Sequence, residues 1–149
     1  MAFDWNGDDF CLLKYFPQTS PNADSVTDFV LAFKSRQDNA VDATGELVAA
    51  VVQSMEQQLR DVDCCQYIVA IPPSTAYRVN ESCERICSRV AARFGWLKHL
   101  DGVLVRTKTV PSSHRSPPWK RPKYADHLAS IEYGGPTFSN AGVIMIDDL

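Results

Sequence analysis

The feature that most constrains the fold is an apolar run near the end of the sequence that leads into two adjacent acids. Residues 143–146 read Val-Ile-Met-Ile without polar alternation, and Asp147 and Asp148 come directly after them. An uninterrupted run of this kind predicts a strand covered on both faces, which is typical of a parallel sheet. Because open α/β sheets bind ligands at the carboxyl ends of their strands, the two aspartates are predicted to lie at a ligand site.

Length and composition favour one globular domain. The chain has 149 residues, of which 45% are hydrophobic, so a single core is expected. The net charge of -3 does not favour a general nucleic-acid binder, because such proteins usually carry a basic excess. No apolar stretch approaches the roughly 18 residues of a membrane span, and no basic segment followed by an apolar one opens the chain. We therefore expect a cytoplasmic protein without a membrane partner.

The five cysteines are predicted to be reduced. Their number is odd and no Cys-x-x-Cys pair occurs, which argues against a disulfide framework. Cys83 and Cys87 lie four residues apart, on one face of a predicted helix. There they could either bind a metal ion as two ligands or pack in the core. The apolar residues that share or flank this face favour core packing, so no metal site is predicted there.

Hydrophobic periodicity predicts two early helices and a buried strand. The first helix is expected from Asp24 or Ser25 to about residues 34–36, and a longer one over residues 38–59. Residues 67–71 are mostly β-branched or aromatic and end at two prolines, which indicates a buried strand followed by a rigid loop.

The second half continues the alternation of helices and strands. A helix is predicted from Asn80, a good cap residue, to Gly95, which is placed as the terminating glycine. A second strand is predicted at residues 103–105, and the proline-rich basic segment 107–122 is predicted to be a long mobile loop. Together with the terminal strand at 143–146, this order predicts a doubly wound α/β fold.

These elements together resemble the type I phosphoribosyltransferase family, and most closely its ComF-like branch. The resemblance implies a Rossmann-like doubly wound, mainly parallel sheet over residues 25–149, preceded by an irregular or edge segment over residues 1–24. The family's acidic motif continues into a Thr-Thr-Gly-type loop that binds the 5-phosphate of phosphoribosyl pyrophosphate. The sequence stops at Leu149, before that loop, its helix and the next strand. The parts that carry the resemblance are the helix at 26–34, the strand and loop at 68–73, the strand at 103–107, the basic loop and residues 143–149.

The resemblance implies a transferase that binds phosphoribosyl pyrophosphate with Mg²⁺ and transfers its ribosyl phosphate to a nitrogen nucleophile, either a nucleobase or an amine. Asp147 and Asp148 are the expected ribose-binding residues, because carboxylates at a strand end can accept hydrogen bonds from vicinal hydroxyls. Two alternatives stay open for the same pair. One is a solvated turn, and the other is a site for a different hydroxylated ligand or Mg²⁺.

The expected diphosphate-binding residues are Pro73, Ser74, Thr75 and Arg78. They lie between a predicted strand and a predicted helix, where backbone amides and the helix start can receive an anion. The resemblance places the leaving diphosphate here. No glycine-rich phosphate motif supports this independently, so a stiff turn with a surface arginine is the alternative.

The basic segment is similar to the family's flexible catalytic loop. Within it, Arg115, Lys120 and Arg121 are the expected catalytic residues, because they would supply positive charge where the leaving group gains negative charge. A solvated linker is one alternative, and an RNA- or DNA-contacting arm over residues 106–121 is another. The cations of the segment are Arg106, Lys108, His114, Arg115, Lys120 and Arg121.

A second hypothesis comes from a different class of protein. It is a catalytically inactive binding or regulatory module that retains the sheet and associates with a partner chain or a second copy through an open C-terminal edge. The two hypotheses differ in the residues expected after Leu149. A reading frame that continues into Thr-Thr-Gly-like residues favours the enzyme, and a chain that ends there favours binding without turnover.

Overall fold

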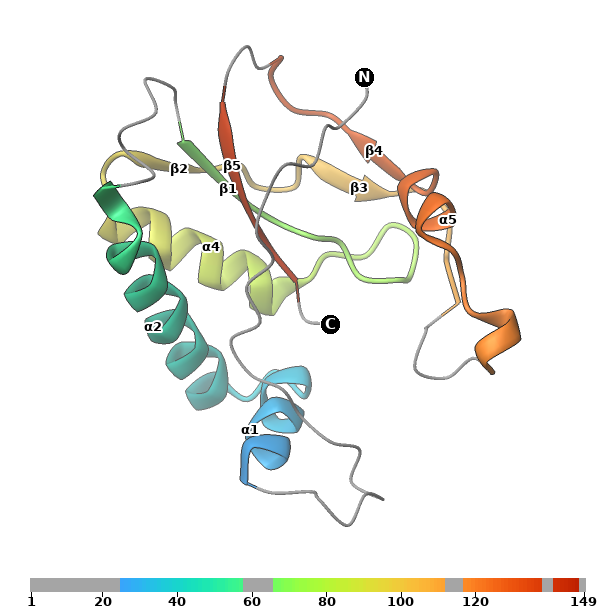
Figure 1. Ribbon diagram of the computed structural model, residues 1–149, viewed down its shortest axis with the longest axis horizontal. Coiled ribbons are helices and arrows are strands. Elements are labelled where there is room, and N and C mark those ends of the chain that lie inside the picture. Colours follow the sequence, from blue (N-terminus) through green and yellow to red (C-terminus); the bar gives the residue numbers. More distant parts are fainter. Residues whose placement is uncertain (1–24, 58–65, 112–116, 138–140, 148–149) are drawn as a thin grey trace.

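The computed structural model describes residues 25–57, 66–111, 117–137 and 141–147. The protein is mixed α/β with a mainly parallel sheet, as the sequence predicted. Figure 1 shows a group of helices on one side of this sheet and a small antiparallel pair of strands with short helices on the other. The loop that follows the central strand lies between these two groups.

The first two helices are α1 (Ser25–Lys34) and α2 (Asp38–Ser54). Arg36 turns the chain between them with a left-handed φ of 60°, and the amide of Gln37 donates to the carbonyl oxygen of Ala32 over 3.0 Å. Both helices begin as predicted, but α2 ends at Ser54 because the backbone of Met55 leaves the helical conformation. In the described ranges, no helix has both the length and the apolar character needed to cross a membrane.

Three strands form the parallel sheet: β1 (Gln66–Ala70), β2 (Leu97–His99) and β5 (Gly142–Ile146). Their order is β2-β1-β5, with β1 in the centre and parallel to both neighbours. The prediction of a parallel terminal strand is confirmed. The predicted cover of both faces is only partial, since every residue of β5 is half-buried and the strand lies at the edge of this sheet among the described strands.

Helix α4 (Glu81–Arg93) packs against β1 and β2, while α2 packs against α4. Asn80 caps α4 by accepting a hydrogen bond from the amide of Cys83 at 3.4 Å. Because these helices bury their apolar faces together, they share one core with the inward side of β1. The residues of this core with no more than 1% of their surface exposed are Ile68, Cys83, Ile86, Cys87 and Val90.

The end of α4 lies close to the predicted one. The helix ends at Arg93, two residues before Gly95, but Gly95 does not end it through a left-handed turn, since among the described glycines only Gly102 has a positive φ. Phe94 instead leaves the helix in an extended conformation, and its side chain is 7% exposed. Burial of this ring turns the chain directly toward Leu97 in β2, a strand that the sequence did not predict because only three residues form it.

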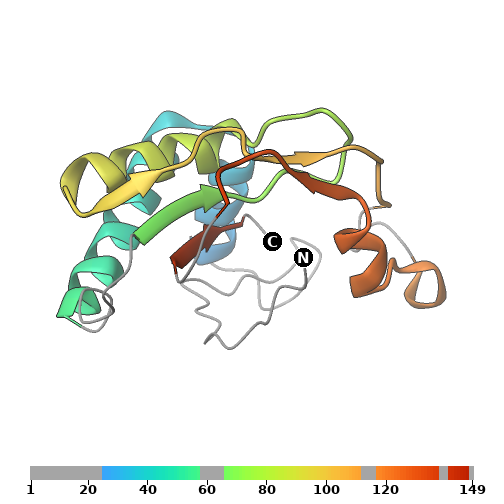
Figure 2. The same ribbon diagram turned by 90° about the horizontal axis from the view of Figure 1, so that it is seen from above.

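The remaining elements form a separate unit, here called the arm: β3 (Leu104–Arg106), the 3-10 helix η1 (Pro118–Lys120), α5 (Tyr124–Leu128) and β4 (Ile131–Tyr133). The strand predicted near residues 103–105 exists, but its place in the parallel sheet is wrong. It pairs antiparallel with β4 instead of joining the main sheet. Its Val105 is 38% exposed, so the strand is not buried as the sequence predicted. Figure 2 shows the arm extending beside the sheet, away from the helices.

Candidate functional site

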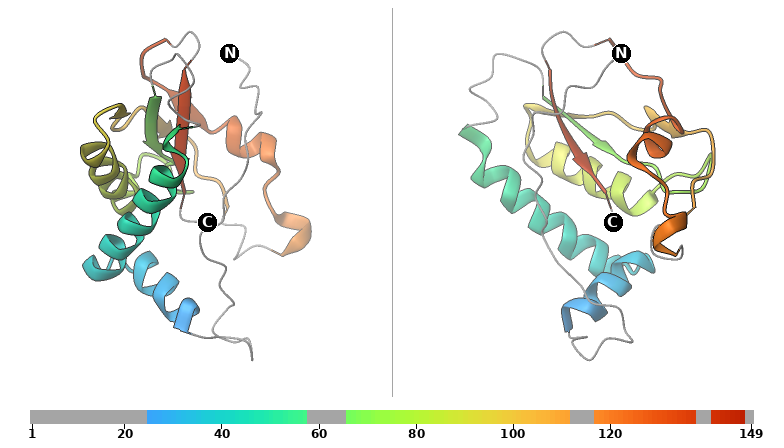
Figure 3. Two further views of the ribbon diagram at one scale, coloured as in Figure 1. Left: turned by 60° about the vertical axis from the view of Figure 1, so that its left-hand side comes forward. Right: turned by 45° about the vertical axis from the view of Figure 1, so that its right-hand side comes forward.

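The carboxyl ends of β1 and β5 lie side by side. Ala70 pairs with Ile146, and the amide of Ile71 donates to the carbonyl oxygen of Ile146 over 2.9 Å. The chain leaves β1 into residues 71–79, here called the β1 loop, and leaves β5 at Asp147. The parallel register therefore brings the predicted diphosphate loop and the first predicted ribose-binding aspartate to one edge of the sheet. In Figure 3 (left), α4 and α5 lie on opposite sides of β5.

Asp147 is exposed at this edge, while Asp148 lies outside the described residues. The negative charge of Asp147 acts on the guanidinium of Arg106, where it favours the charged form. A carboxylate has two oxygens with several lone pairs, so it can accept more than one hydrogen bond. The predicted ribose-binding role is thus compatible with the position of Asp147.

Arg106, the last residue of β3, is the one charged side chain that is buried in the described part of the chain, with 4% of its surface exposed. Its Nε donates to the carbonyl oxygen of Pro73 over 2.6 Å, and its other nitrogens donate to Pro72 and to the hydroxyl of Ser130. Burial lowers the pKa of the guanidinium, and the charge of Asp147 opposes this shift. The sequence analysis placed Arg106 among the cations of the basic loop. In the structure, Arg106 is buried, and its hydrogen bonds connect the arm to the β1 loop.

Three further hydrogen bonds, each donated by a backbone amide, strengthen this connection. The amide of Val110 donates to the carbonyl oxygen of Ser74 over 2.9 Å, and the amide of Ala76 donates to the hydroxyl of Thr109 over 3.0 Å. The amide of Tyr77 donates to the last carbonyl oxygen of β3 over 2.8 Å, with Tyr77 held at a left-handed φ of 55°. These contacts fix the shape of the β1 loop from the arm side.

The four predicted diphosphate-binding residues all lie in the β1 loop. Pro73 and Ser74 are half-buried, and their carbonyl oxygens accept hydrogen bonds from the arm. Thr75 and Arg78 are exposed. Within the described ranges, the amides of Ser74 and Thr75 make no hydrogen bond, so these two donors suit an anion.

A small cavity of about 70 Å³ lies where the β1 loop meets the start of α4. Arg78, Asn80 and Glu84 contribute polar groups to its lining. The Nδ2 of Asn80 is buried and donates to no group in the described structure, although the Oδ1 of the same side chain caps α4. A buried donor without a partner costs about 1–3 kcal/mol, so this amide is available to an acceptor in the cavity.

Glu84, His99 and Asp101 form a second polar cluster at the carboxyl end of β2. Their potential metal-binding atoms all lie within 4.8 Å of one another. The sequence did not single them out, because His99 and Asp101 flank the end of a strand that was not predicted. Their only local signal is a histidine two residues before an aspartate, which alone is not specific.

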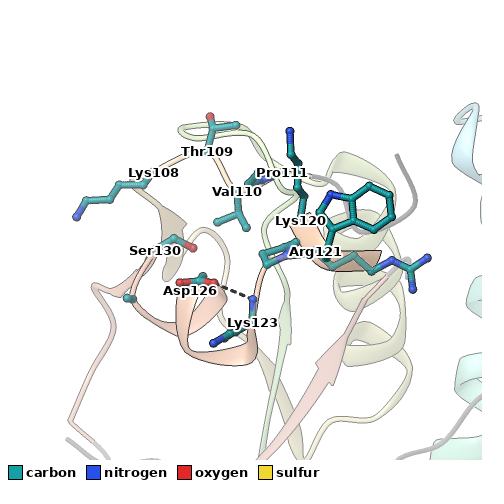
Figure 4. A pocket seen from close by; sticks show the side chains of 12 residues that line it. Lys108, Thr109, Val110, Pro111, Lys120, Arg121, Lys123, Asp126 and Ser130 are labelled. Carbon is teal, nitrogen blue, oxygen red and sulfur yellow. Dashed lines mark hydrogen bonds between the residues drawn. The ribbon is translucent and has the colours of Figure 1, made fainter. Parts of the chain in front are cut away.

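The basic segment lines an open cavity of about 480 Å³ in the arm. Lys120 and Arg121 are exposed, and Arg115 lies outside the described residues. Figure 4 shows the ends of Lys108, Lys120 and Arg121 pointing in different directions rather than toward one point. In this conformation Lys120 and Arg121, the two expected catalytic cations in the described residues, do not converge on one point where a phosphate could bind.

The prediction for Cys83 and Cys87 is confirmed, since both side chains are fully buried in the core. Burial, with a smaller contribution from the charge of Glu84, raises the pKa of the Cys87 thiol to about 12. A thiol of this kind stays protonated at neutral pH and packs as a small apolar group. Cys87 is therefore a structural residue.

Comparison with protein-family models, with curated proteins and with solved structures finds no match to this chain.

Proposed function

We propose that the edge formed by β1 and β5 binds phosphoribosyl pyrophosphate, and that the protein is a ComF-like type I phosphoribosyltransferase with a Rossmann-like doubly wound core. The reaction would transfer ribosyl phosphate to a nitrogen nucleophile, either a nucleobase or an amine. The observation that carries the proposal is the adjacency of the β1 loop and Asp147 at the carboxyl edge of a parallel sheet.

The strand order supports this choice of edge. From β1 the chain crosses through α4 to β2 on one side, while β5 lies on the other side of β1. In open α/β sheets, ligands bind where the strand order reverses in this way, outside the carboxyl ends of the strands. The loop after β1 and the residue after β5 are the segments that meet at this point.

Each residue of the edge has a chemical role in the proposal. Asp147, with Asp148, would accept hydrogen bonds from the ribose hydroxyls while the anomeric carbon gains positive charge. The amides of Ser74 and Thr75, with Arg78, would bind the diphosphate. In the transfer step the bond between the anomeric carbon and the diphosphate oxygen breaks and the electron pair leaves with diphosphate. The nitrogen forms the new bond to that carbon and releases its proton to solvent.

Lys120 and Arg121, with Arg115, would stabilise the charge that develops on the leaving diphosphate. Because the ends of Lys120 and Arg121 point outward, the proposal requires the basic segment to move toward the β1 loop when substrate binds. Arg106 would hold the fixed end of that segment through its bonds to Pro72 and Pro73.

Mg²⁺ fits the same edge by its donor chemistry. It prefers oxygen ligands and commonly binds through one or two carboxylates together with substrate phosphates, and the carboxylate of Asp147 is exposed where the diphosphate would lie. When bound with substrate, the ion would neutralise part of the diphosphate charge.

Calorimetry with phosphoribosyl pyrophosphate and Mg²⁺ tests the proposal. Asp147→Asn keeps the size of the side chain but removes its charge, so affinity should fall by about tenfold or more, as expected for the loss of a charged hydrogen-bond partner. Glu132→Gln, an exposed change in β4, is the matched control and should bind like the unaltered protein. No heat, or equal heat from all three proteins, contradicts the ribose site.

The role of the basic segment needs a separate measurement. Replacing Arg115, Lys120 and Arg121 by alanine should reduce diphosphate release in the presence of nucleobases or ammonia much more than it weakens substrate binding. Lys98→Ala removes an exposed charge in β2 and serves as the control. An equal loss of binding and turnover would show that the segment acts only as a binding surface.

A binding module that associates through its sheet edge is the second candidate, and one observation favours it. Among the described strands, β5 pairs only with β1. An open edge offers unpaired backbone groups to a partner strand. If this edge mediates self-association, light scattering should show a dimer whose population falls in Val143→Lys, since a charged residue on an edge strand opposes pairing.

A further inference from the structure

The cluster of Glu84, His99 and Asp101 lies on a different flank of the sheet from Asp147. Glu84 belongs to the first turn of α4, His99 ends β2, and Asp101 lies in the turn toward β3. Because β2 and β5 lie on opposite sides of β1, the cluster and Asp147 occupy separate positions along the same edge. The cluster is therefore distinct from the proposed ribose site.

Regular secondary structure holds two of the three side chains in place. The Nε2 of His99 and Oε2 of Glu84 are 2.6 Å apart, and these side chains are only 16% and 15% exposed. The other carboxylate oxygen of Glu84 accepts a hydrogen bond from the amide of Gly102 at 3.4 Å, which orients the group. Ligands placed on a helix and a strand are positioned more accurately than ligands on loops.

A simple hydrogen-bonded pair between His99 and Glu84 does not account for the whole arrangement. It leaves a second carboxylate, that of Asp101, within 4.8 Å of the other two groups. It also leaves the buried Nδ2 of Asn80 without a partner in the described structure, and Asn80 lines the same small cavity as Glu84 and Gly102. A water molecule or small anion in this cavity, beside Glu84, would supply an acceptor for this donor.

We propose that Glu84, His99 and Asp101 bind one divalent transition-metal ion of the Zn²⁺ class, and that Asn80 donates to a water or small anion in the remaining coordination position. One imidazole and two carboxylates suit Zn²⁺, whereas Mg²⁺ prefers oxygen ligands alone. In a tetrahedral Zn²⁺ site, bonds of about 2.0–2.1 Å place the ligand atoms about 3.3 Å apart. The ion would replace the direct contact between Glu84 and His99, and the exposed side chain of Asp101 would close over it.

The ion would join α4, β2 and the turn toward β3 beneath the β1 loop. Since Glu84 in α4 is 15 residues from His99 along the chain, the unfolded chain does not hold the three ligands together, and bound metal should stabilise the folded state by mass action. This site does not depend on the proposed transferase activity. Asp147→Asn should therefore leave metal binding unchanged.

Titration of the metal-free protein with Co²⁺, followed by visible absorption, tests the site, with Zn²⁺ calorimetry and thermal unfolding as second readouts. We expect one equivalent of Co²⁺ to give the absorption of a four- or five-coordinate ion, and Zn²⁺ to displace it and raise the melting temperature. Asp101→Asn alters only an exposed side chain, so the protein should fold normally yet bind both ions more than about tenfold more weakly. His99→Gln should abolish the absorption.

Two controls make the outcome decisive. His127→Gln changes a half-buried histidine in α5, away from the cluster, and should bind like the unaltered protein. Mg²⁺ should not displace Co²⁺ at comparable concentration. Equal binding by Asp101→Asn, weak binding of several equivalents, or an intense thiolate-to-cobalt charge-transfer band, which would indicate cysteine ligation, each overturns the proposal.

Discussion

The helix and sheet layer and the arm are stabilised by different kinds of interaction. In the layer, α2, α4 and β1 bury apolar side chains such as Ile68 and Ile86 completely. In the arm, Val105, Trp119 and Leu128 are 38%, 81% and 50% exposed, and attachment depends on the buried guanidinium of Arg106 with a few backbone hydrogen bonds. The layer therefore has its own buried core, whereas few apolar contacts attach the arm, so a displacement of the arm would leave that core intact.

This difference is useful for the proposed function. A transferase has to hold its ribose and diphosphate groups in fixed positions, yet it has to admit substrate and then exclude water. The β1 loop lies between the two regions, with one end in the sheet and its middle bonded to the arm. Four predictions test whether the two regions respond to perturbation as differently as their contacts indicate.

The largest effect is expected in the layer. Ile86→Ala removes a fully buried side chain from the face of α4 and should lower the free energy of unfolding by about 2–5 kcal/mol. Urea denaturation followed by far-UV circular dichroism measures the change. Leu128→Ala, in the arm, removes a side chain that is 50% exposed and should cost far less. Similar losses in the two variants would contradict the comparison.

The second prediction concerns the buried thiol of the layer. Because the pKa of Cys87 is raised to about 12 in the folded state, folding favours the neutral thiol. This contribution is fully present below the unfolded pKa of about 8.5–9 and is lost as the pH rises toward about 12. Between these limits, unfolding free energy should fall by up to about 1.4 kcal/mol per pH unit more steeply in the unaltered protein than in Cys87→Ala. If the unfolding free energies of the two proteins change equally with pH, the thiol of Cys87 is not shielded from water.

The third prediction concerns the attachment of the arm. Arg106→Met leaves the carbonyl oxygen of Pro73 and the hydroxyl of Ser130 without their buried donor, which should cost about 1–3 kcal/mol locally. Hydrogen exchange at the amides of Thr107 and Val110 should become faster by about tenfold or more, while the amides of β1 keep their protection.

Lys108→Met is the matched control, since Lys108 is exposed two residues further along the chain. It should leave the exchange rates unchanged. If Arg106→Met accelerates exchange equally in the arm and in β1, the two regions unfold as one unit.

The smallest effect is expected on the outer surface of the layer, where arginines of α4 pair with acids of α2. Arg89 donates to Asp42, and both side chains are more than 40% exposed. Exposed ion pairs contribute little, so a double-mutant cycle with Arg89→Ala and Asp42→Ala should give a coupling of about 0.2–1 kcal/mol. The coupling should shrink at high salt. A value above about 2 kcal/mol would mean that these charges, rather than the core, fix the packing of the two helices.

Much of the layer could be predicted from local pattern. The start of α1, the cap of α4 at Asn80, the core position of Cys83 and Cys87, and the strand before the double proline are all indicated by short-range signals. Helical spacing and capping act within a few residues, so they can be recognised without knowledge of the fold.

The arm could not be predicted in the same way. The apolar residues of β3 look like those of any short buried strand, and only the pairing with β4 shows that this strand lies outside the parallel sheet. Arg106 was grouped with the loop cations because nothing in its local sequence distinguishes a buried guanidinium from an exposed one. Its burial depends on carbonyl oxygens of Pro72 and Pro73, which are more than thirty residues away.

Local sequence patterns are enough to predict that Asp147 follows an apolar strand, that a proline-rich loop comes after another strand, and that the cysteines of α4 face a core. The tertiary structure decided that these two strand ends are neighbours, that Arg106 connects the arm to the β1 loop, and that Glu84, His99 and Asp101 meet at the end of β2. The physical reason is that strand propensity and helix periodicity are local properties. Strand order, and the burial of polar groups that depends on it, arises from contacts between residues far apart in the chain.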